Sequence, residues 1–335
     1  MGWMGKILWG MLLCLGSLGA TAWGQPQIII KFSHVVAPDT PKGKAAEYFK
    51  WRAETLTRGR VRVDVYPNSQ LYKDKEELEA LQLGAVQMLA PSLAKFGPLG
   101  IREFEVFDLP YIFDNYDMLH RITQGSVGRE LLDKLDAKGI KGLAFWDNGF
   151  KSFSANTPIH LPGDLKGKRL RIQSSKVLDE EIRALGGRPQ VMPFSEVYPA
   201  LKAGVIDGTE NPVSNFYTQK MYLVQPYLSL TDHGYLGYAV IVNKRFWDEL
   251  PADVRSALEQ AVRDSTLYAN RIAKEENDRA LEAVRRSGKT HIYQPNARER
   301  AAFKQALIPV HARMAARIGP DLIRAIYRET GFKAN

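Results

Sequence analysis

The chain has 335 residues, of which 45% are hydrophobic and 25% are charged. This ordinary globular balance excludes a disordered or fibrous protein, and the length is sufficient for two domains. The formal net charge is +9, but the Lys and Arg residues are scattered among acidic residues and form no block. We therefore expect a solvated basic surface with a mild attraction for anions, and no nucleic-acid partner.

The first 24 residues have the pattern of a secretory signal peptide. Lys6 precedes the apolar run Ile7–Leu18, and the small–x–small triplet Ala22–Gly24 precedes Gln25. We expect cleavage after this triplet, because the apolar run is shorter than the roughly 20 residues that a membrane anchor needs. The only cysteine, Cys14, lies in this segment, so the mature chain has no disulfide and no thiol chemistry. These features predict a protein exported to the periplasm.

The mature chain begins with alternating strand and helix patterns. An apolar strand at 28–34 precedes a helix that starts at Pro41. Alternating valines predict a half-buried strand at 61–65, Asp74 begins the next helix, and 86–90 form another strand. This order of elements predicts an α/β domain with a largely parallel sheet.

A second set of elements has a similar layout. It comprises strands at 142–146, 169–173, 191–192 and 205–206 and two helices capped by Ser175 and Ser195. No low-complexity linker separates the two sets. We therefore expect two lobes joined by ordered strands that cross from one to the other.

The segment from Pro251 to Gly288 keeps a helical apolar stripe between a typical start residue and a typical stop residue. At ~1.5 Å per residue such a helix spans roughly 55 Å, whereas a domain of ~150 residues is only about 40 Å across. We expect one long helix that runs across both lobes. Helices around 303–307 and 322–326 are then expected to close the second lobe.

Motifs for the common catalytic and metal chemistries do not occur in the sequence. There is no HExxH, no Cys/His cluster, no glycine-rich phosphate loop and no G-x-S-x-G, and the six histidines lack metal-ligand spacing. We expect no metal, no cofactor and no catalysis. The alternative from another class is a periplasmic hydrolase that uses Glu196 or Glu210 with a histidine.

Residue patterns alone indicate a few candidates for binding an anion. Arg171 lies in the middle of a predicted strand, and a guanidinium matches a carboxylate with two parallel hydrogen bonds, although a solvated strand face fits the pattern as well. Lys151 follows the predicted turn Asp147–Gly149 and is equally compatible with a surface loop. Asn211 before a proline fits a ligand contact or a turn, and Phe194 fits a ligand platform or the core.

Long motifs spread over nearly the whole mature chain carry a family resemblance. They are IKFSHVVAPDTPKG (30–43), YPNSQLYKDKEELEALQLGAVQMLAPSLAKFGPLG (66–100), FEVFDLPYIF (104–113), WDNGFKSFSAN (146–156), GKRLRIQSSKVL (167–178), VMPFSEVYPAL (191–201), VIDGTENPVSNFYTQK (205–220) and HGYLGYAVIVNK (233–244). These motifs resemble the periplasmic solute-binding subunits of tripartite ATP-independent periplasmic (TRAP) transporters, the DctP family. The likeness is strongest to the branch that binds the four-carbon dicarboxylates malate, succinate and fumarate.

The resemblance implies a two-lobed periplasmic binding protein of the α/β class, type II-like, with crossing strands and a long helix shared by both lobes. The implied first lobe comprises 25–148 and 237–276. The implied second lobe comprises 149–236 and 277–335, with the ligand cleft between the two lobes.

The resemblance also implies a set of ligand-binding residues. Arg171 is the arginine that pairs with the ligand carboxylate, and Lys151 stands where other branches of the family have a second arginine. Lys42 is a further possibility outside the set. The remaining implied residues are Asn211 and Phe194 from the second lobe, His34, Lys73, Ser92 and Lys95 from the first, and His233 near the crossing strands.

The function implied is capture of a small dicarboxylate and its delivery to the small and large permease subunits of a TRAP transporter. The lobes are expected to close on the dianion by a hinge motion without any nucleotide. We expect a monomer. Two alternatives keep the same fold, namely a binding subunit for another organic acid, such as a keto acid or an aromatic carboxylate, and a ligand-sensing partner of a membrane kinase. The sequence leaves open which dicarboxylate is preferred.

Overall fold

The computed structural model describes residues 27–333, and the predicted signal peptide lies outside this range. The strands are β1 Ile28–Ser33, β2 Val61–Tyr66, β3 Met88–Leu89, β4 Ile140–Ala155, β5 Arg169–Ile172, β6 Arg188–Val191, β7 Gly208–Asn211, β8 Tyr227–Asn243 and β9 His291–Tyr293. The longer helices are α1 Pro41–Leu56, α9 Ala252–Ser287, α10 Ala297–Leu307, α11 Pro309–Ile318 and α12 Pro320–Thr330. The shorter helices are α2 Glu77–Gln82, α3 Tyr116–Thr123, α4 Ser126–Asp133, α5 Lys176–Ala184, α6 Phe194–Lys202, α7 Val213–Thr218 and α8 Lys244–Asp248. Short 3-10 helices are η1 Leu93–Lys95, η2 Arg102–Asp108, η3 Lys134–Lys138, η4 Pro162–Leu165 and η5 Met221–Leu223.

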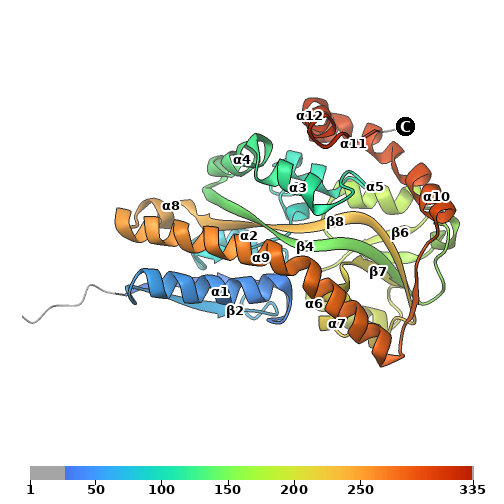
Figure 1. Ribbon diagram of the computed structural model, residues 1–335, viewed down its shortest axis with the longest axis horizontal. Helices are drawn as coiled ribbons and strands as arrows, with labels where there is room; N and C mark the ends of the chain where they lie inside the picture. The colour runs from blue at the N-terminus through green and yellow to red at the C-terminus, as the bar shows by residue number, and fades with distance from the viewer. Residues whose placement is uncertain (1–26, 334–335) are drawn as a thin grey trace, which may run out of the picture.

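One nine-stranded sheet, in the order β2-β1-β3-β8-β4-β7-β5-β6 with β9 beside β8, runs through the molecule. Helices cover both of its faces (Figure 1), and the chain forms the two lobes that the sequence predicts. The outer strands pair in parallel, β1 with β2 and β3 in one lobe and β5 with β6 and β7 in the other. The prediction of a largely parallel sheet is wrong at the centre, where β3, β8, β4 and β7 pair antiparallel.

The two longest strands, β4 and β8, cross from one lobe to the other. Their antiparallel pairing extends from Ile140 opposite Asn243 to Ala155 opposite Tyr227, with irregularities that include one between Asp147 and Gly149. The predicted turn at Asp147–Gly149 is therefore wrong, because pairing with β8 carries the chain straight through it. Asn-Gly is a common turn sequence, but here the irregular pair is a bulge within a long strand.

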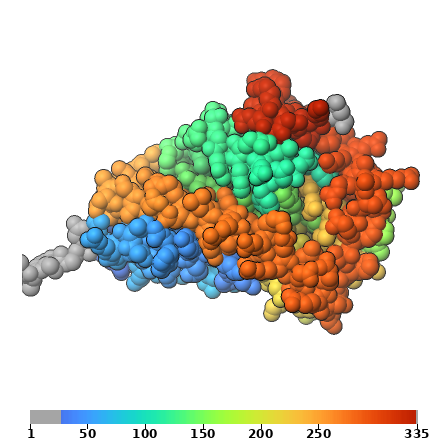
Figure 2. Space-filling model, viewed as in Figure 1, coloured from blue at the N-terminus to red at the C-terminus, as the bar shows by residue number. Residues whose placement is uncertain are grey.

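The 36-residue helix α9 confirms the predicted long helix, and it ends at Gly288, whose φ is 62°. Its first half lies beside α1, and both helices lie on the face of the molecule seen in Figure 2. Buried Ala261 and Ala269 belong to an apolar cluster with α1, β1 and β2, whereas Ala280 and Val284 belong to a separate cluster with α6 and α7. The helix thus contributes to the core of both lobes.

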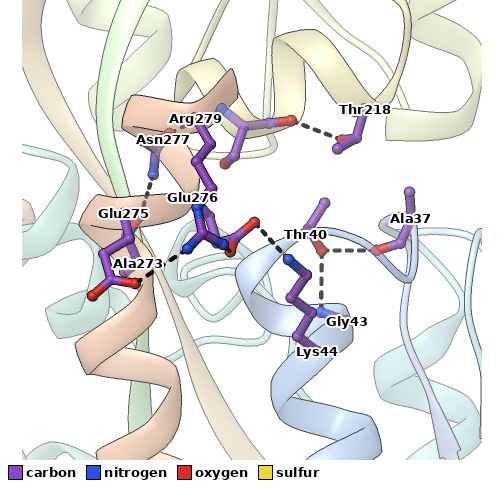
Figure 3. Close-up of polar contacts among 11 residues, drawn as sticks. Ala37, Thr40, Gly43, Lys44, Thr218, Ala273, Glu275, Glu276, Asn277 and Arg279 are labelled. Atoms are coloured by element: carbon purple, nitrogen blue, oxygen red, sulfur yellow. Dashed lines mark hydrogen bonds and ion pairs between the residues drawn. The ribbon is translucent and has the colours of Figure 1, made fainter. Parts of the chain in front are cut away.

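Polar contacts hold the second half of α9 to elements of both lobes (Figure 3). Lys44 of α1 reaches Glu276 at 2.6 Å, and Arg279 contacts the same carboxylate at 2.8 Å. Asn277 accepts a hydrogen bond from the Ser214 amide at the start of α7 and donates one to the Asn148 carbonyl in β4, at 2.9 Å and 2.7 Å. These contacts fix the position at which α9 passes the crossing strands.

The C-terminal helices pack against two different clusters. Phe303 and Leu307 of α10 lie with Phe153 and Leu170 of the second lobe. The apolar faces of α11 and α12 join a cluster with η2 and α3 instead. Among the described residues, no helix is both long and apolar enough to cross a membrane.

Several predicted helix starts and strands differ from the structure, and at Asp74 tertiary contacts are the reason. Helix α2 begins at Glu77 and not at Asp74, whose carboxylate accepts the Phe194 amide and pairs with Lys95. Ser195 lies inside α6, which Pro193 precedes, and Ser175 caps α5 as predicted. The strand expected at 205–206 is wrong, since the strand is β7, which begins at Gly208.

We predict that Asn277→Ala lowers the free energy of unfolding by about 1–3 kcal/mol, because the Ser214 amide and the Asn148 carbonyl both lose their partner. Urea denaturation followed by circular dichroism measures the change. Lys274→Ala on the same helix removes only a solvated pair with Asp278 and should stay within about 0.5 kcal/mol of the unaltered protein. Equal effects of the two substitutions would contradict the assigned role of Asn277.

Candidate functional site

A small cavity of about 20 Å³ lies where elements of the two lobes meet at the crossing strands. Parts of the first lobe, the crossing strand β8 and the second lobe all contribute to its wall. It is lined by Val35, Val36, Lys42, Asp74, Ser92, Lys95, Arg171, Gln173, Phe194, Asn211, Asn215, Leu236 and Tyr238. Cationic and amide side chains therefore converge on one small space, as in sites that fix a small polar ligand.

Arg171 of β5 is 3% exposed and lines this cavity. Its Nε donates a 3.0 Å hydrogen bond to the Met192 carbonyl, and the guanidinium carbon lies 5.6 Å from the centre of the Phe194 ring. Burial lowers the pKa of Arg171, although the Asp74 carboxylate opposes this effect. A guanidinium remains charged at any physiological pH, so the cavity wall holds a permanent buried cation oriented by its backbone partner and aromatic neighbour.

Lys95 and two acidic residues form a second charged group at the wall. The Lys95 ammonium lies 2.8 Å from the Asp74 carboxylate and also contacts the Glu77 carboxylate. Burial raises the pKa of Asp74, but Lys95 and Arg171 outweigh it and hold this pKa well below its usual range. Lys95 therefore already has two carboxylate partners in the protein.

Lys42 lies in the first turn of α1 and is 1% exposed. Its Nζ donates a 3.0 Å hydrogen bond to the Ala90 carbonyl and lies 3.8 Å from the centre of the Tyr238 ring. Burial lowers its pKa to about 7. His34 is buried too, and burial together with the Lys42 charge lowers the pKa of the imidazole to about 3, so this ring is neutral.

Contacts across the cleft join the two lobes in the conformation described. The Phe194 amide donates to the Asp74 carboxylate at 2.7 Å, and the Gln173 amide donates to the Ser92 hydroxyl at 2.7 Å. At the surface Lys73 pairs with Glu196 at 3.0 Å, with about half of each side chain exposed. The cavity is therefore enclosed by both lobes.

A second buried charge cluster, formed by Lys151, Glu181, Glu210 and His233, lies outside this cavity lining. Lys151 Nζ is 2.7 Å from the Glu210 carboxylate, and His233 Nε2 is 3.1 Å from Glu210 and 3.2 Å from Glu181. Successive residues of a strand point to opposite faces, so Glu210 of β7 joins this cluster while Asn211 lines the cavity.

The cluster is held by mutual charge compensation. Burial raises the pKa of Glu210, but Lys151 and His233 outweigh it and lower this pKa to about 2. Burial lowers the pKa of His233, but Glu181 and Glu210 outweigh it and raise this pKa. Glu181, Glu210 and His233 place ligand atoms within 4.8 Å of one another, a spacing that could hold a metal ion. The Lys151 ammonium already supplies positive charge beside Glu210.

The structure brings together five of the nine residues proposed for the site: Arg171, Asn211, Phe194, Ser92 and Lys95 all line the cavity. The other four are placed elsewhere. Lys151 and His233 belong to the second cluster, Lys73 lies at the surface, and His34 lies beside the lining residue Val35.

Several lining residues were missed by the sequence reasoning. They are Asp74, Gln173, Asn215 and Tyr238. Alternation along β5 could have suggested Gln173, which is two residues after Arg171. The other three carry no local signal, because only the tertiary fold brings their side chains to the cavity.

A larger hollow, of about 640 Å³, lies between Tyr111, α10 and the C-terminal residues around Phe332. Its Lys304 pairs with Asp114 at 3.5 Å. This hollow lacks a buried cation such as Arg171, so the charge needed to hold a small anion is found in the smaller cavity.

The chain is similar to known proteins over most of its length. The family model of the bacterial extracellular solute-binding proteins, family 7, matches residues 32–318. A C4-dicarboxylate-binding periplasmic protein of Rhodobacter capsulatus is 64% identical over 314 residues, which are 94% of this chain and 94% of that protein.

Two solved structures are similar over almost their whole length. A TRAP periplasmic solute-binding protein of Sulfurospirillum deleyianum with bound succinate has 44% identity and a TM-score of 0.87, covering 90% of this chain and 99% of that one. One of Pseudomonas aeruginosa with bound L-malate has 42% identity and a TM-score of 0.83, covering 85% of this chain and 99% of that one.

We predict that Glu210→Gln lowers the free energy of unfolding by roughly 3 kcal/mol at pH 7, because Lys151 and His233 lose a buried counter-charge. The folded-state pKa of Glu210, about 2, lies below its ordinary value of 4.5, so its contribution is present above pH 4.5 and is lost as the pH falls toward 2. Urea denaturation at several pH values should show the difference between the variant and the unaltered protein shrinking below pH 4.5.

Glu196→Gln is the matched control, because it removes a half-exposed pair with Lys73. It should cost less than about 1 kcal/mol. A Glu210→Gln effect no larger than this control, or one that is independent of pH, would show that the cluster does not depend on that carboxylate.

Proposed function

Because the chain belongs to the bacterial extracellular solute-binding proteins of family 7, we propose that it captures C4-dicarboxylates such as succinate and malate and delivers them to a TRAP-type membrane permease. The names of its relatives support the substrate class. The Rhodobacter protein is a C4-dicarboxylate-binding protein, and the two similar structures contain succinate and L-malate.

The observation that carries this proposal is the buried guanidinium of Arg171 in the enclosed cavity. The hydrogen bond described for it uses Nε, so both terminal nitrogens are available for a carboxylate. A guanidinium holds a carboxylate with two parallel hydrogen bonds, which fix orientation as well as charge. Phe194 packs near this group, and Asn211 adds an amide that can donate or accept.

The expected binding free energy is sufficient for capture of the ligand. Charge-assisted hydrogen bonds contribute about 1.5–3 kcal/mol each, and capture at micromolar concentration needs about −8 kcal/mol. A few such bonds, together with exclusion of water as the lobes close, therefore suffice. We propose a hinge motion for this closure, with the contacts between Asp74 and the Phe194 amide and between Lys73 and Glu196 forming as the cleft shuts.

We propose binding without catalysis. The carboxylates considered for a hydrolase are engaged elsewhere, since Glu196 pairs with Lys73 at the surface and Glu210 pairs with Lys151 in the second cluster. Neither Glu196 nor Glu210 lines the cavity that holds Arg171. The geometry supports a ligand held between the lobes and released unchanged.

The remaining parts of the proposal concern location and partners. We propose export by the N-terminal signal at 1–24, a monomeric protein in the periplasm, and docking of the ligand-bound form on the small and large permease subunits. The roles of Lys151, His34, Lys73 and His233 in ligand binding stay predictions. A partner sensor kinase would use the same ligand-bound form.

We predict that Arg171→Lys weakens succinate binding at least about tenfold, because a lysine keeps the charge but cannot form the two parallel hydrogen bonds. Isothermal titration calorimetry on mature protein, unfolded and refolded to remove carried-over ligand, measures the dissociation constant. Malate and fumarate titrations extend the measurement to the substrate class.

Arg169→Lys is the control on the same strand, because Arg169 is partly exposed and pairs with Asp207 outside the cavity. It should bind succinate as the unaltered protein does. Unchanged binding of every dicarboxylate by Arg171→Lys would refute the role of Arg171. Binding of monocarboxylates alone by the unaltered protein would refute the substrate class.

A further inference from the structure

The cavity holds two cations whose described hydrogen bonds go only to backbone carbonyls. Arg171 donates to Met192 and Lys42 donates to Ala90. Lys95, the third cation of the lining, already contacts the carboxylates of Asp74 and Glu77. Among the cations that line this cavity in the described chain, Arg171 and Lys42 are thus the two without a carboxylate within salt-bridge distance.

The position of Lys42 is costly for the free protein. A cation is favoured at the C-terminal end of a helix and disfavoured at the N-terminal end, yet Lys42 lies in the first turn of the 16-residue helix α1. Its ammonium is also almost completely buried, and its described hydrogen bond goes to a carbonyl, which does not neutralise the charge. Two separate features of the fold therefore destabilise the charged form of this lysine until an anion is present.

Lys151, by contrast, has its counter-charge built into the fold. Its ammonium contacts Glu210, and Glu181 and Asp108 raise its pKa further although burial opposes them. A ligand carboxylate would have to compete with a buried ion pair at this position. At Lys42 it would replace or supplement only a carbonyl contact.

We propose that Lys42 receives the second carboxylate of the bound dicarboxylate, opposite the carboxylate held by Arg171, and so selects dicarboxylates over monocarboxylates. This inference rests on the proposed function and deepens it, because it names the residue that distinguishes the two ligand classes. It also gives each carboxylate of the dianion a cationic partner in the lining of one cavity.

A consequence is that the ligand and a proton bind together at neutral pH. Burial lowers the pKa of Lys42 to about 7 in the free protein, with Glu77 and Asp74 raising it and Lys95 lowering it. A carboxylate beside the ammonium favours the charged form and raises the pKa again. Binding therefore takes up a proton, and affinity falls as the pH rises above 7.

The other charged and titratable groups that face Lys42 do not explain such a pH dependence near neutrality. His34, on the loop before α1, has a pKa of about 3 and stays neutral. The Tyr238 pKa on β8 is raised by burial far above this range, and that of Asp74 is held far below it. The pKa of Lys95 on η1 is raised by its carboxylate partners although burial opposes them, and burial raises the pKa of Glu77 on α2. Glu77 is the one neighbour whose shift points toward the tested range, so a Lys42 variant is needed to assign the effect.

The first experiment titrates succinate and the monocarboxylate butyrate into the unaltered protein, Lys42→Met and Lys44→Met. Lys44 is the control because it lies on the same helix, outside the cavity, and pairs with Glu276. Lys42→Met should lower the preference for succinate over butyrate at least about tenfold, while Lys44→Met should leave it unchanged. An unchanged preference in Lys42→Met would overturn the proposal and leave the proposed function standing. Failure of the unaltered protein to bind any dicarboxylate would instead refute the proposed function.

The second experiment can overturn the proposal with the unaltered protein alone, even if Lys42→Met fails to fold. Calorimetry of succinate binding in buffers with different ionisation enthalpies gives the protons taken up. We expect about half a proton per ligand at pH 7, following the Lys42 pKa of about 7, and an affinity that falls up to about tenfold per pH unit above this value. A folded Lys42→Met should lose this dependence, which excludes Glu77 as its source. No proton uptake between pH 6 and pH 9 would overturn the proposal.

Discussion

The antiparallel pairing of β4 with β8 is the constraint on which the rest of the structure depends. These strands stay paired from Ile140 and Asn243 in one lobe to Ala155 and Tyr227 in the other, so both lobes are built on one continuous sheet. At the bulge between them, buried Asn148 donates to Asn215 and to the Tyr238 hydroxyl. Hydrogen bonds with fixed directions, and not only apolar packing, therefore set how the lobes meet. Asn215 and Tyr238 also line the cavity, so the same network joins the crossing of the strands to the wall of the site.

The buried charged residues form two groups, which differ in whether the protein itself supplies their counter-charge. The cluster around Glu210 contains its own counter-charges, and a compensated buried cluster contributes little net stability although removing one member is costly. Arg171 and Lys42 are instead oriented by carbonyl groups, which satisfy a hydrogen bond but do not neutralise a charge. A dianion that reaches both removes the unfavourable energy of two poorly compensated cations. Part of the affinity is therefore prepared in the folded protein before the ligand arrives, as in other preorganised sites.

Much of the fold could be predicted from local patterns, whereas the composition of the site could not. Residues at Pro41, Ser175 and Gly288 start or stop helices where the sequence indicates, because capping depends on a few neighbouring residues. Asp74 has the same capping chemistry, but its carboxylate is used by Lys95 and the Phe194 amide, which are distant in the sequence. For the same reason no pattern separates Lys42, buried at the cavity, from Lys44, paired with Glu276 on the surface of the same helix. Burial and ion pairing depend on contacts between elements that are distant in the sequence. A single sequence carries no direct signal for either.

The contacts that span the cleft are too weak to hold it closed by themselves. Lys73 and Glu196 are each about half exposed, and such a pair contributes at most about 1 kcal/mol. The contacts of Asp74 with the Phe194 amide and of Gln173 with Ser92 add two hydrogen bonds, which exchange for water when the cleft opens. A ligand shifts an equilibrium between conformations only by its difference in affinity for them. A dianion that touches Arg171 in one lobe and Lys42 in the other makes both contacts only when the lobes are together, so bridging the two cations supplies that difference. Asp74 lies next to both Lys95 and the Phe194 amide, and it thereby couples the charge in the cavity to the contact that closes over it.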